Sequence, residues 1–295
     1  MTGAGAPLKL AIIGAGVMGR NYLRAAQAAG IPVAFITDAN LDAAAQAAAP
    51  YNCAVLANPK PSDMDAAVIA VPTAHHAAVA LPLLKAHVHC LVEKPFVACA
   101  AEGAALIAAA KNAVLQVGHI ERFNPAVEAL SAHNIDPARI TSLTARRMGP
   151  ASARVTDISI VVDLMVHDLD IVLALKPMAV AKIEVTGTAD HAEAKLTFAD
   201  GAVADLIASR TSQMRVRTLD ITTKDGDYRL DYIAKSLLTA ASSAQNAYIG
   251  DALGAELAHF VACIKNKARP RVSGETALAV MNLTWRIEAA LGKAA

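Results

Sequence analysis

A glycine pattern placed directly after an apolar run constrains this chain more than any other feature. The run Leu10–Ile13 leads into the motif GAGVMG at positions 14–19, and an alanine-rich stretch typical of a helix follows. A second apolar run, Val33–Thr37, ends on the acid Asp38. Strand, glycine turn, helix and strand together make the βαβ unit that binds dinucleotides, with the pyrophosphate at the positive end of the helix dipole. A glycine-rich turn in an unrelated α/β core is the alternative.

The three glycines and the acid predict which cofactor this unit takes. Gly14 permits the tight turn, Gly16 lets the backbone approach a pyrophosphate, and Gly19 lets the helix pack against the strand. The carboxylate of Asp38 can accept hydrogen bonds from both hydroxyls of the adenosine ribose, and it would repel a 2′-phosphate. We therefore expect NAD as the cofactor.

Length and composition exclude several classes of protein. At 295 residues the chain exceeds one comfortable hydrophobic core, so two domains are expected. A net charge of +1 gives no electrostatic basis for binding nucleic acid. The cysteines lack the C-x-x-C spacing of zinc sites, and we interpret them as reduced thiols of a cytoplasmic protein without a metal site. They are Cys53, Cys90, Cys99 and Cys263.

One stretch of the chain imitates a membrane span. Residues 66–84 contain no Asp, Glu, Lys or Arg and are long enough to cross a bilayer. Pro72, Pro82 and the pair His75-His76 favour instead a buried strand, a turn and a helix. Residues 1–7 have neither the basic region nor the apolar core of a signal peptide. We expect no membrane segment.

Strands and helices are expected to alternate up to about residue 119. The apolar runs 66–71, 89–92 and 114–118 suit parallel strands covered on both faces, and helical patterns lie between them. This alternation predicts an α/β Rossmann domain with a doubly wound parallel sheet. We place this NAD-binding domain at residues 1–119.

After Asn124 the pattern changes to that of an α+β domain. Asp200-Gly201 and Asp225-Gly226 stand between alternating segments, as hairpin turns do. We expect a second domain at 120–295, with an open, mainly antiparallel sheet, that binds the substrate and supports oligomerisation. Its C-terminal helix can pack back on the first domain. Helical patterns at about 159–175 and 251–265 flank alternating segments at 182–188, 193–198, 202–209, 215–223 and 227–232.

The tripeptide Glu93-Lys94-Pro95 directly follows a late strand of the first domain. The carboxyl ends of parallel strands face the ligand crevice of a doubly wound fold. Lys94 is thus placed to reach the nicotinamide end of a bound cofactor. The alternative is a solvated surface lysine before a turn.

Asp163 and His167 are four residues apart in an expected helix, so they lie on one face, one turn apart. An imidazole beside a carboxylate makes a plausible general base, because the acid fixes the tautomer and stabilises the imidazolium. One alternative is an ordinary helix start with a hydrogen-bonded histidine. Another is a metal site, but no second histidine stands at ligand spacing.

In their order along the chain these motifs resemble the glucose–fructose oxidoreductase/inositol dehydrogenase/MocA (Gfo/Idh/MocA) family of NAD(P)-dependent oxidoreductases. The resemblance runs from about residue 10 to 290, and includes VPTAHH at 71–76, EKP at 93–95 and VGHIERFNP at 117–125. It implies that Lys94, His167 and Asp163 are catalytic. The residues assigned to the cofactor are Gly14, Gly16, Val17, Met18, Gly19, Asp38, Val71, Pro72, Thr73, His76, Glu93 and Lys94.

One departure from the family narrows this resemblance. Many members have a glycine-rich run before the catalytic aspartate, whereas this chain has ISIVV at 158–162. With residues 118–125 and 163–168, this segment looks like the subgroup of UDP-N-acetylglucosamine 3-dehydrogenases, whose 3-keto nucleotide sugar passes to a partner aminotransferase. Such a substrate carries a pyrophosphate, which guanidinium groups bind well. The residues assigned to it are Arg122, Asn124, Arg147, Arg154 and His167, with Arg146 as a further cation; ordinary surface arginines are the alternative.

The resemblance implies reversible hydride transfer between a sugar hydroxyl and NAD. His167 would take the proton, Lys94 would stabilise the charge on the oxygen, and Asp163 would orient one of them. Two alternatives stay open: a dehydrogenase of inositol or of a free sugar on the same scaffold, and a non-catalytic NAD-binding regulator. Because open antiparallel sheets usually cover their free face, we expect a homodimer or homotetramer.

Overall fold

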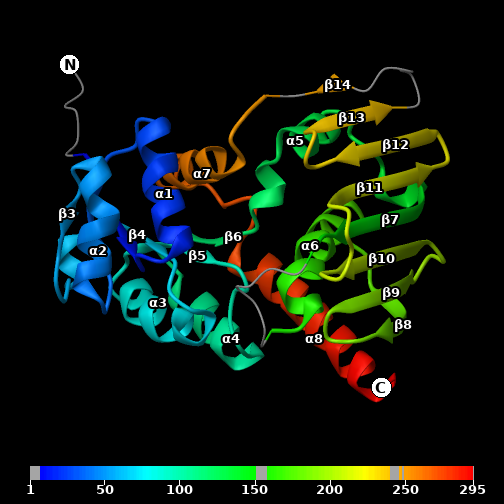
Figure 1. Ribbon diagram of the computed structural model, residues 1–295, viewed down its shortest axis with the longest axis horizontal. Coiled ribbons are helices and arrows are strands. Elements are labelled where there is room, and N and C mark those ends of the chain that lie inside the picture. Colours follow the sequence, from blue (N-terminus) through cyan, green and yellow to red (C-terminus); the bar gives the residue numbers. More distant parts are fainter. Residues whose placement is uncertain (1–6, 151–157, 240–245, 248, 295) are drawn as a thin grey trace. The chain divides into compact units, whose positions relative to one another are not determined.

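The computed structural model describes residues 7–150, 158–239, 246–247 and 249–294 (Figure 1). The chain divides into two units. The first consists of Met1–Ile120 and Asp251–Leu278, and the second of Glu121–Gly250 and Ala279–Ala295. Helix α8 (Gly274–Ala294) therefore has residues in both units.

A parallel sheet with the strand order β3-β2-β1-β4-β5-β6 forms the centre of the first unit. This order confirms the predicted doubly wound sheet, whose switch point lies between β1 and β4. Its strands are β1 (Leu10–Ile13), β2 (Val33–Thr37), β3 (Ala54–Val55), β4 (Ala66–Ile69), β5 (His89–Glu93) and β6 (Leu115–Gly118). Its helices are α1 (Val17–Ala28), α2 (Leu41–Ala48), α3 (His76–Lys85), α4 (Ala100–Ala109) and α7 (Ala252–Asn266), with 3-10 turns at Ala49–Tyr51, Pro61–Asp63, Thr73–His75 and Ile120–Phe123.

The carboxyl ends of the central strands lie at one edge of this sheet. Ile13 pairs with Thr37 of β2 and with Ile69 of β4, and Glu93 of β5 pairs with Gly118 of β6. The residues that follow the strands are thereby gathered at the same edge, where doubly wound sheets bind their ligands. They include Gly14, Asp38, Val71, Lys94 and His119.

Helix α7 returns the chain to the first unit. Leu257 and Phe260 of α7 are fully buried and belong to the same apolar cluster as Tyr22 and Leu23 of α1. The two helices pack side by side (Figure 1). Each large apolar side chain removed from water contributes about 1.5–3 kcal/mol, so this contact fixes the helix predicted at 251–265 on the nucleotide-binding unit.

The second unit is built on one open sheet with the order β14-β13-β12-β11-β7-β10-β9-β8. Only β7 and β10 pair in parallel among these neighbours, so the predicted, mainly antiparallel sheet is confirmed. Its strands are β7 (Ile140–Met148), β8 (Val180–Gly187), β9 (His191–Phe198), β10 (Val203–Ser209), β11 (Val216–Thr223), β12 (Gly226–Asp231), β13 (Ser236–Thr239) and β14 (Asn246–Ala247). Other elements are α5 (Pro125–Ser131), a 3-10 turn (Pro137–Arg139), a π-helix (Val161–Met165) and α6 (Val166–Leu175).

Strand β7 lies in the middle of this sheet although no alternating pattern predicts it. Its buried positions include Ile140, Leu143 and Ala145, but the next buried position is Arg147. A charged residue on the covered face breaks the apolar alternation from which strands are recognised. The strand therefore depends on the partners that its arginine finds in the folded chain.

In the part of the chain that the structure describes, no helix has the length and apolar character needed to cross a membrane. The uncharged stretch 66–84 instead forms β4, a 3-10 turn and most of α3. All four cysteines are free thiols.

Candidate active site

The glycine turn after β1 has the space that a pyrophosphate needs. Gly14 has a φ of +108°, and a Cβ there would lie 2.5 Å from the carbonyl oxygen of Ala70. A Cβ on Gly19 would lie 1.9 Å from the carbonyl oxygen of Gly14, whereas a Cβ on Gly16 would meet nothing within 4 Å. Gly16 also begins α1 without a capping side chain, so the first N–H groups of that helix can receive an anion.

Asp38 connects the end of β2 to the glycine turn. One carboxylate oxygen accepts the N–H of Ala15 at 2.7 Å, and the other accepts the N–H of Asn40 at 2.8 Å. Each oxygen has two lone pairs, so each can still accept a ribose hydroxyl. The side chain is thus oriented in advance for the ribose.

A cavity of about 880 Å³ opens beside Asp38 within the first unit. Its walls carry apolar groups with few polar ones, which is typical of sites for an aromatic base. They include Leu41, Pro59, Pro72, His75 and Val79. The turn, the acid and this cavity together fit an adenine dinucleotide.

His76, assigned from sequence to the cofactor, is buried in the structure and contacts two backbone carbonyl groups. The imidazole is 1% exposed, and its Nδ1 and Nε2 lie 3.1 Å from the oxygen of Phe96 and 3.0 Å from that of Val71. Burial lowers the pKa of His76, more than the carbonyl contacts raise it. The ring therefore links the loop after β4, with Val71, Pro72 and Thr73, to the segment after Lys94.

Glu93 and Lys94 end β5 at the ligand edge of the sheet. Glu93 is 7% exposed, and it accepts hydrogen bonds from the Tyr22 hydroxyl at 2.8 Å and from the Lys94 N–H at 3.1 Å. Burial raises the pKa of Glu93, against the opposing effects of the Tyr22 hydroxyl and of Lys94. Lys94 is half-buried and its peptide bond to Pro95 is cis. The acid thus holds the turn from which the lysine projects.

Asp163 and His167 stand where a π-helix passes into an α-helix. The π-helix Val161–Met165 contains Asp163, and His167 lies in the first turn of α6. The helix predicted from residue 159 thus starts with a wider turn, a feature that often marks functional sites. Both side chains are half-buried.

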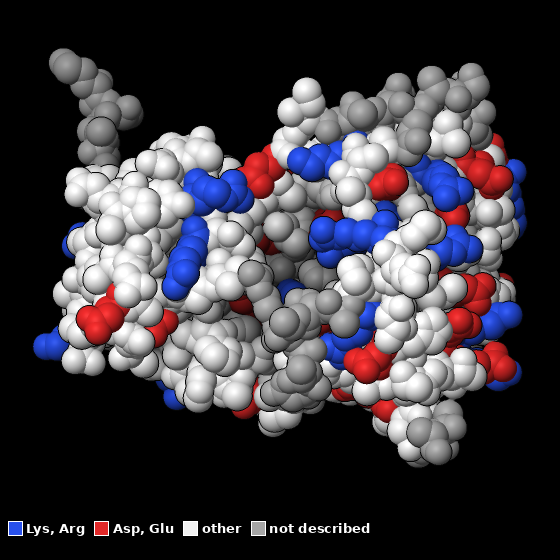
Figure 2. All heavy atoms as spheres, viewed as in Figure 1, with Lys and Arg blue, Asp and Glu red and all other residues white. Residues whose placement is uncertain are grey.

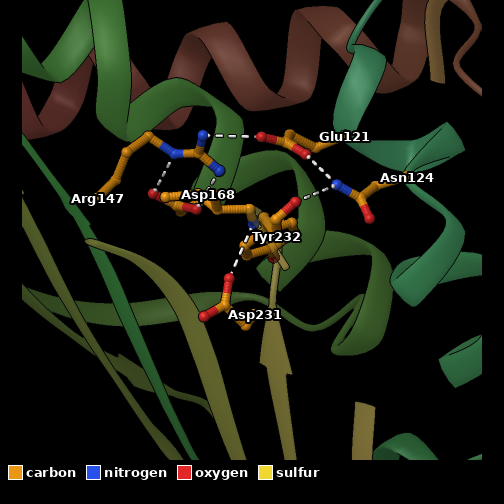
Figure 3. Close-up of polar contacts among 7 residues, drawn as sticks. Glu121, Asn124, Arg147, Asp168, Asp231 and Tyr232 are labelled. Carbon is orange, nitrogen blue, oxygen red and sulfur yellow. Dashed lines mark hydrogen bonds and ion pairs between the residues drawn. The ribbon is translucent and has the colours of Figure 1, made fainter. Parts of the chain in front are cut away.

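Arg147 forms a buried ionic network beneath α6 (Figure 3). Its Nε and Nη2 donate to the two oxygens of Asp168 at 2.9 Å each, and its Nη1 donates to Glu121 at 2.8 Å. The arginine is 2% exposed. Burial lowers the pKa of Arg147, but the two carboxylates raise it further, so the guanidinium stays charged. Because Asp168 follows His167 directly, this network anchors the turn that carries the histidine.

The other described residues assigned to the substrate have hydrogen-bond partners within the second unit. Arg122 is paired with the buried Asp170 through two hydrogen bonds, and Arg146 pairs with Asp220 at 3.0 Å. Asn124 is buried and donates to Glu121 and to the Tyr232 carbonyl oxygen at 3.1 Å each. Arg154 lies outside the described residues. Arg122, Asn124 and Arg147 therefore build the second unit, and we do not propose them as ligands.

Arg217, which sequence analysis missed, is a cation whose guanidinium makes no hydrogen bond or ion pair with the described residues. It stands on β11 directly opposite Arg147 and is half-buried. Burial and the Arg147 charge lower the pKa of Arg217, while Glu121 and Asp168 counteract them. Its neighbour across the sheet is Tyr232, whose N–H donates to the Arg217 oxygen. The Tyr232 hydroxyl is also buried without a described partner.

Charges of both signs are interspersed on the visible surface of the second unit (Figure 2).

Comparison with known proteins identifies the family. A family model described as "Oxidoreductase family, NAD-binding Rossmann fold" matches residues 8–119. The UDP-N-acetylglucosamine 3-dehydrogenase of Acidithiobacillus ferrooxidans is 36% identical over 244 residues, which are 78% of this chain and 76% of that protein. The chain belongs to the Gfo/Idh/MocA family of oxidoreductases.

Solved structures match the fold over nearly the whole chain. The structure of the Acidithiobacillus ferrooxidans enzyme has a TM-score of 0.91 at 30% identity, and the match covers 98% of this chain and 99% of that one. Levoglucosan dehydrogenase with NADH and levoglucosan, at 21% identity and a TM-score of 0.86, shares the fold over 98% of both chains. Inositol 2-dehydrogenase 2 of Paenarthrobacter aurescens is 33% identical over 42% of this chain and 41% of that protein. This Gfo/Idh/MocA member is an NAD-dependent dehydrogenase, and the non-catalytic alternative is set aside.

Proposed function

We propose that this dehydrogenase oxidises the 3-hydroxyl of UDP-N-acetylglucosamine to a ketone, with NAD as the hydride acceptor. The observation that carries the proposal is its similarity to an enzyme of that name, at 36% identity over 78% of the chain and with a TM-score of 0.91. The glycine turn and Asp38 supply the contacts that NAD needs. The keto sugar is a substrate for an aminotransferase, the partner that we expect in the same pathway.

The residues of this chain have separate tasks in the proposed reaction. His167 takes the proton of the sugar hydroxyl, and Lys94 donates a hydrogen bond to the same oxygen and stabilises its developing negative charge. Asp163 orients one of these two groups. Bound NAD supplies the position that receives the hydride. The Arg147–Asp168 pair holds the first turn of α6, so it fixes where His167 can act.

Arg217 is the residue that we propose for the substrate's pyrophosphate. Arg122, Arg146 and Arg147 are paired with carboxylates, whereas Arg217 has guanidinium donors to offer. A pyrophosphate oxygen accepts such donors in a fork geometry.

NADH formation with UDP-N-acetylglucosamine tests the proposed function. We expect turnover that is measurable by absorbance and that increases when an aminotransferase removes the keto product. Free N-acetylglucosamine, glucose and myo-inositol should be slower by about a hundredfold or more, because the uridine diphosphate supplies binding energy that orients the ring.

A variant at Arg217 makes this test specific. Arg217→Ala should raise the KM for UDP-N-acetylglucosamine roughly tenfold or more, as loss of a hydrogen bond to a charged group does. Arg229→Ala, an exposed arginine of β12, is the matched control. Turnover of a free polyol with none of any UDP-sugar, even with the product removed, would assign the chain to the inositol-type alternative instead.

Asp38 should determine cofactor preference. We expect the wild type to favour NAD over NADP by about ten- to a thousandfold in kcat/KM, the range that lost polar contacts imply. Asp38→Ser should narrow this gap, because the serine hydroxyl is uncharged and does not repel the 2′-phosphate. Asp42→Ser, an exposed acid of α2, is the control. Equal use of both cofactors by the wild type would contradict the role of Asp38.

We also propose a homodimer or homotetramer in which a second copy covers the open face of the large sheet. A groove of about 490 Å³ on this unit is lined by side chains of β7 to β10, including Thr144, Arg146, Lys195 and Asp205.

The four free cysteines suit the reducing cytoplasm, where we place the enzyme.

A further inference from the structure

Three groups that can carry a proton meet at one point of the first unit, next to Lys94. The phenol oxygen of Tyr22 lies 2.8 Å from Oε1 of Glu93 and 2.9 Å from Oε2 of Glu256. The side chains come from α1, β5 and α7, and Tyr22 and Glu256 are fully buried. Neither of these two has a role in the reaction as proposed above.

A count of protons shows that one of the two carboxyl groups is protonated. A phenol has a single proton and donates only one hydrogen bond. Both contacts are at hydrogen-bond distance, so a carboxyl group must donate the second bond to the phenol oxygen. The phenol itself keeps its proton, because burial above all raises the pKa of Tyr22.

Glu93 is the carboxyl group of this trio that lies beside a lysine. Burial raises the pKa of Glu93, whereas the N–H and the charge of Lys94 both act in the opposite direction and favour its ionised form. Strand β6 adds no charge next to the two acids. The Gln116 side chain donates to the backbone oxygen of Glu256 at 3.2 Å. Gly118 lies next to Glu93, since a Cβ on this glycine would be 3.2 Å from the carboxylate. With Glu93 ionised, the hydrogen bonds would run from Glu256 to Tyr22 and from Tyr22 to Glu93.

We propose that Tyr22 and Glu256 are positioning residues, which share one proton with Glu93 and so hold this acid ionised and fixed beside Lys94. This inference rests on the proposed role of Lys94. Helix α7 belongs to the first unit, and it carries Glu256, the acid that completes the trio.

Infrared spectroscopy tests the shared proton without any substrate. The difference spectrum of wild type minus Glu256→Gln at neutral pH should show the carbonyl band of a buried protonated carboxyl group. Wild type minus Glu128→Gln, which changes an exposed glutamate of α5, should not show it. Absence of the band from the first spectrum overturns the proposal.

The pH dependence of stability gives a second readout. A glutamate whose pKa is raised by folding stabilises the fold below its unfolded pKa, and this contribution is lost as the pH rises through the folded pKa. The Tm of the wild type should therefore fall as the pH rises from the unfolded pKa to the folded pKa of the protonated acid. Glu256→Gln should make this fall smaller, since the glutamine side chain donates to Tyr22 but does not titrate. An identical Tm-against-pH curve for the two proteins contradicts the shared proton.

Kinetics separate a positioning role from a merely structural one. Tyr22→Phe removes the donor to Glu93 and should lower kcat roughly tenfold, as loss of a hydrogen bond to a charged group does. It should also shift the pH profile of kcat while the KM for NAD stays near the wild-type value. A wild-type profile in both Tyr22→Phe and Glu256→Gln overturns the positioning role. The infrared and Tm experiments need no substrate, so they test the shared proton even if no UDP-sugar is turned over. Failure of the proposed function and failure of the shared proton can therefore be told apart.

Discussion

Replacing His167 with Asn, or Lys94 with Ala, should lower kcat about a hundredfold or more, which is typical for loss of a positioned acid–base group. Asparagine keeps much of the volume of His167 but cannot take the proton of the hydroxyl. Alanine at Lys94 removes the cation that stabilises the oxygen. Initial rates of NADH formation measure the effect, and titration with NAD should show nearly unchanged affinity.

The controls for this pair are exposed residues of the same types. His133→Asn and Lys85→Ala should leave kcat at the wild-type value. Near-normal turnover in either active-site variant, with the fold intact by circular dichroism, would remove that residue from the mechanism.

Loss of Arg147 should cost about 3–5 kcal/mol in the free energy of unfolding, because removal of one partner leaves buried charges uncompensated. Arg147→Ala strands the carboxylates of Asp168 and Glu121, which are 2% and 7% exposed. Urea unfolding followed by circular dichroism measures the change. Activity should fall as well, since Asp168 belongs to the turn that carries His167.

The neighbouring arginine is the matched control for this prediction. Arg146 pairs with Asp220, but its side chain is 38% exposed. Exposed pairs contribute at most about 1 kcal/mol, so Arg146→Ala should have a small effect. Equal losses for Arg146→Ala and Arg147→Ala would show that burial of the network adds nothing.

The nucleotide-binding fold could be predicted because local constraints determine it. Strands β1 and β4 are covered on both faces, so each is a continuous apolar run. The tight contact at Gly14 excludes any side chain, which is why the motif is readable in the sequence. Strand β3 could not be predicted because its two residues are too few to show a period, and β7 because Arg147 interrupts the apolar alternation on its buried face.

The candidate site was only partly predictable. Lys94, Asp163 and His167 were selected by motif, and their roles remain predictions. For the arginines, residue type indicates a charge but not its partner. Arg147 and Asp168 are 21 positions apart, and Arg122 and Asp170 are 48 apart. Arg217 stands out only in the folded chain, because only there are Arg122, Arg146 and Arg147 paired with carboxylates.

By itself, the sequence determined the parallel sheet, the glycine turn and the acid after β2, since these depend on backbone conformation and on neighbours along the chain. The tertiary structure decided which charged groups are paired and which remain available to a ligand. Tyr22 and Glu256 are 234 positions apart, yet they share a hydrogen bond in a fully buried site. Burial makes such contacts strong and determines protonation, and burial exists only in the folded chain.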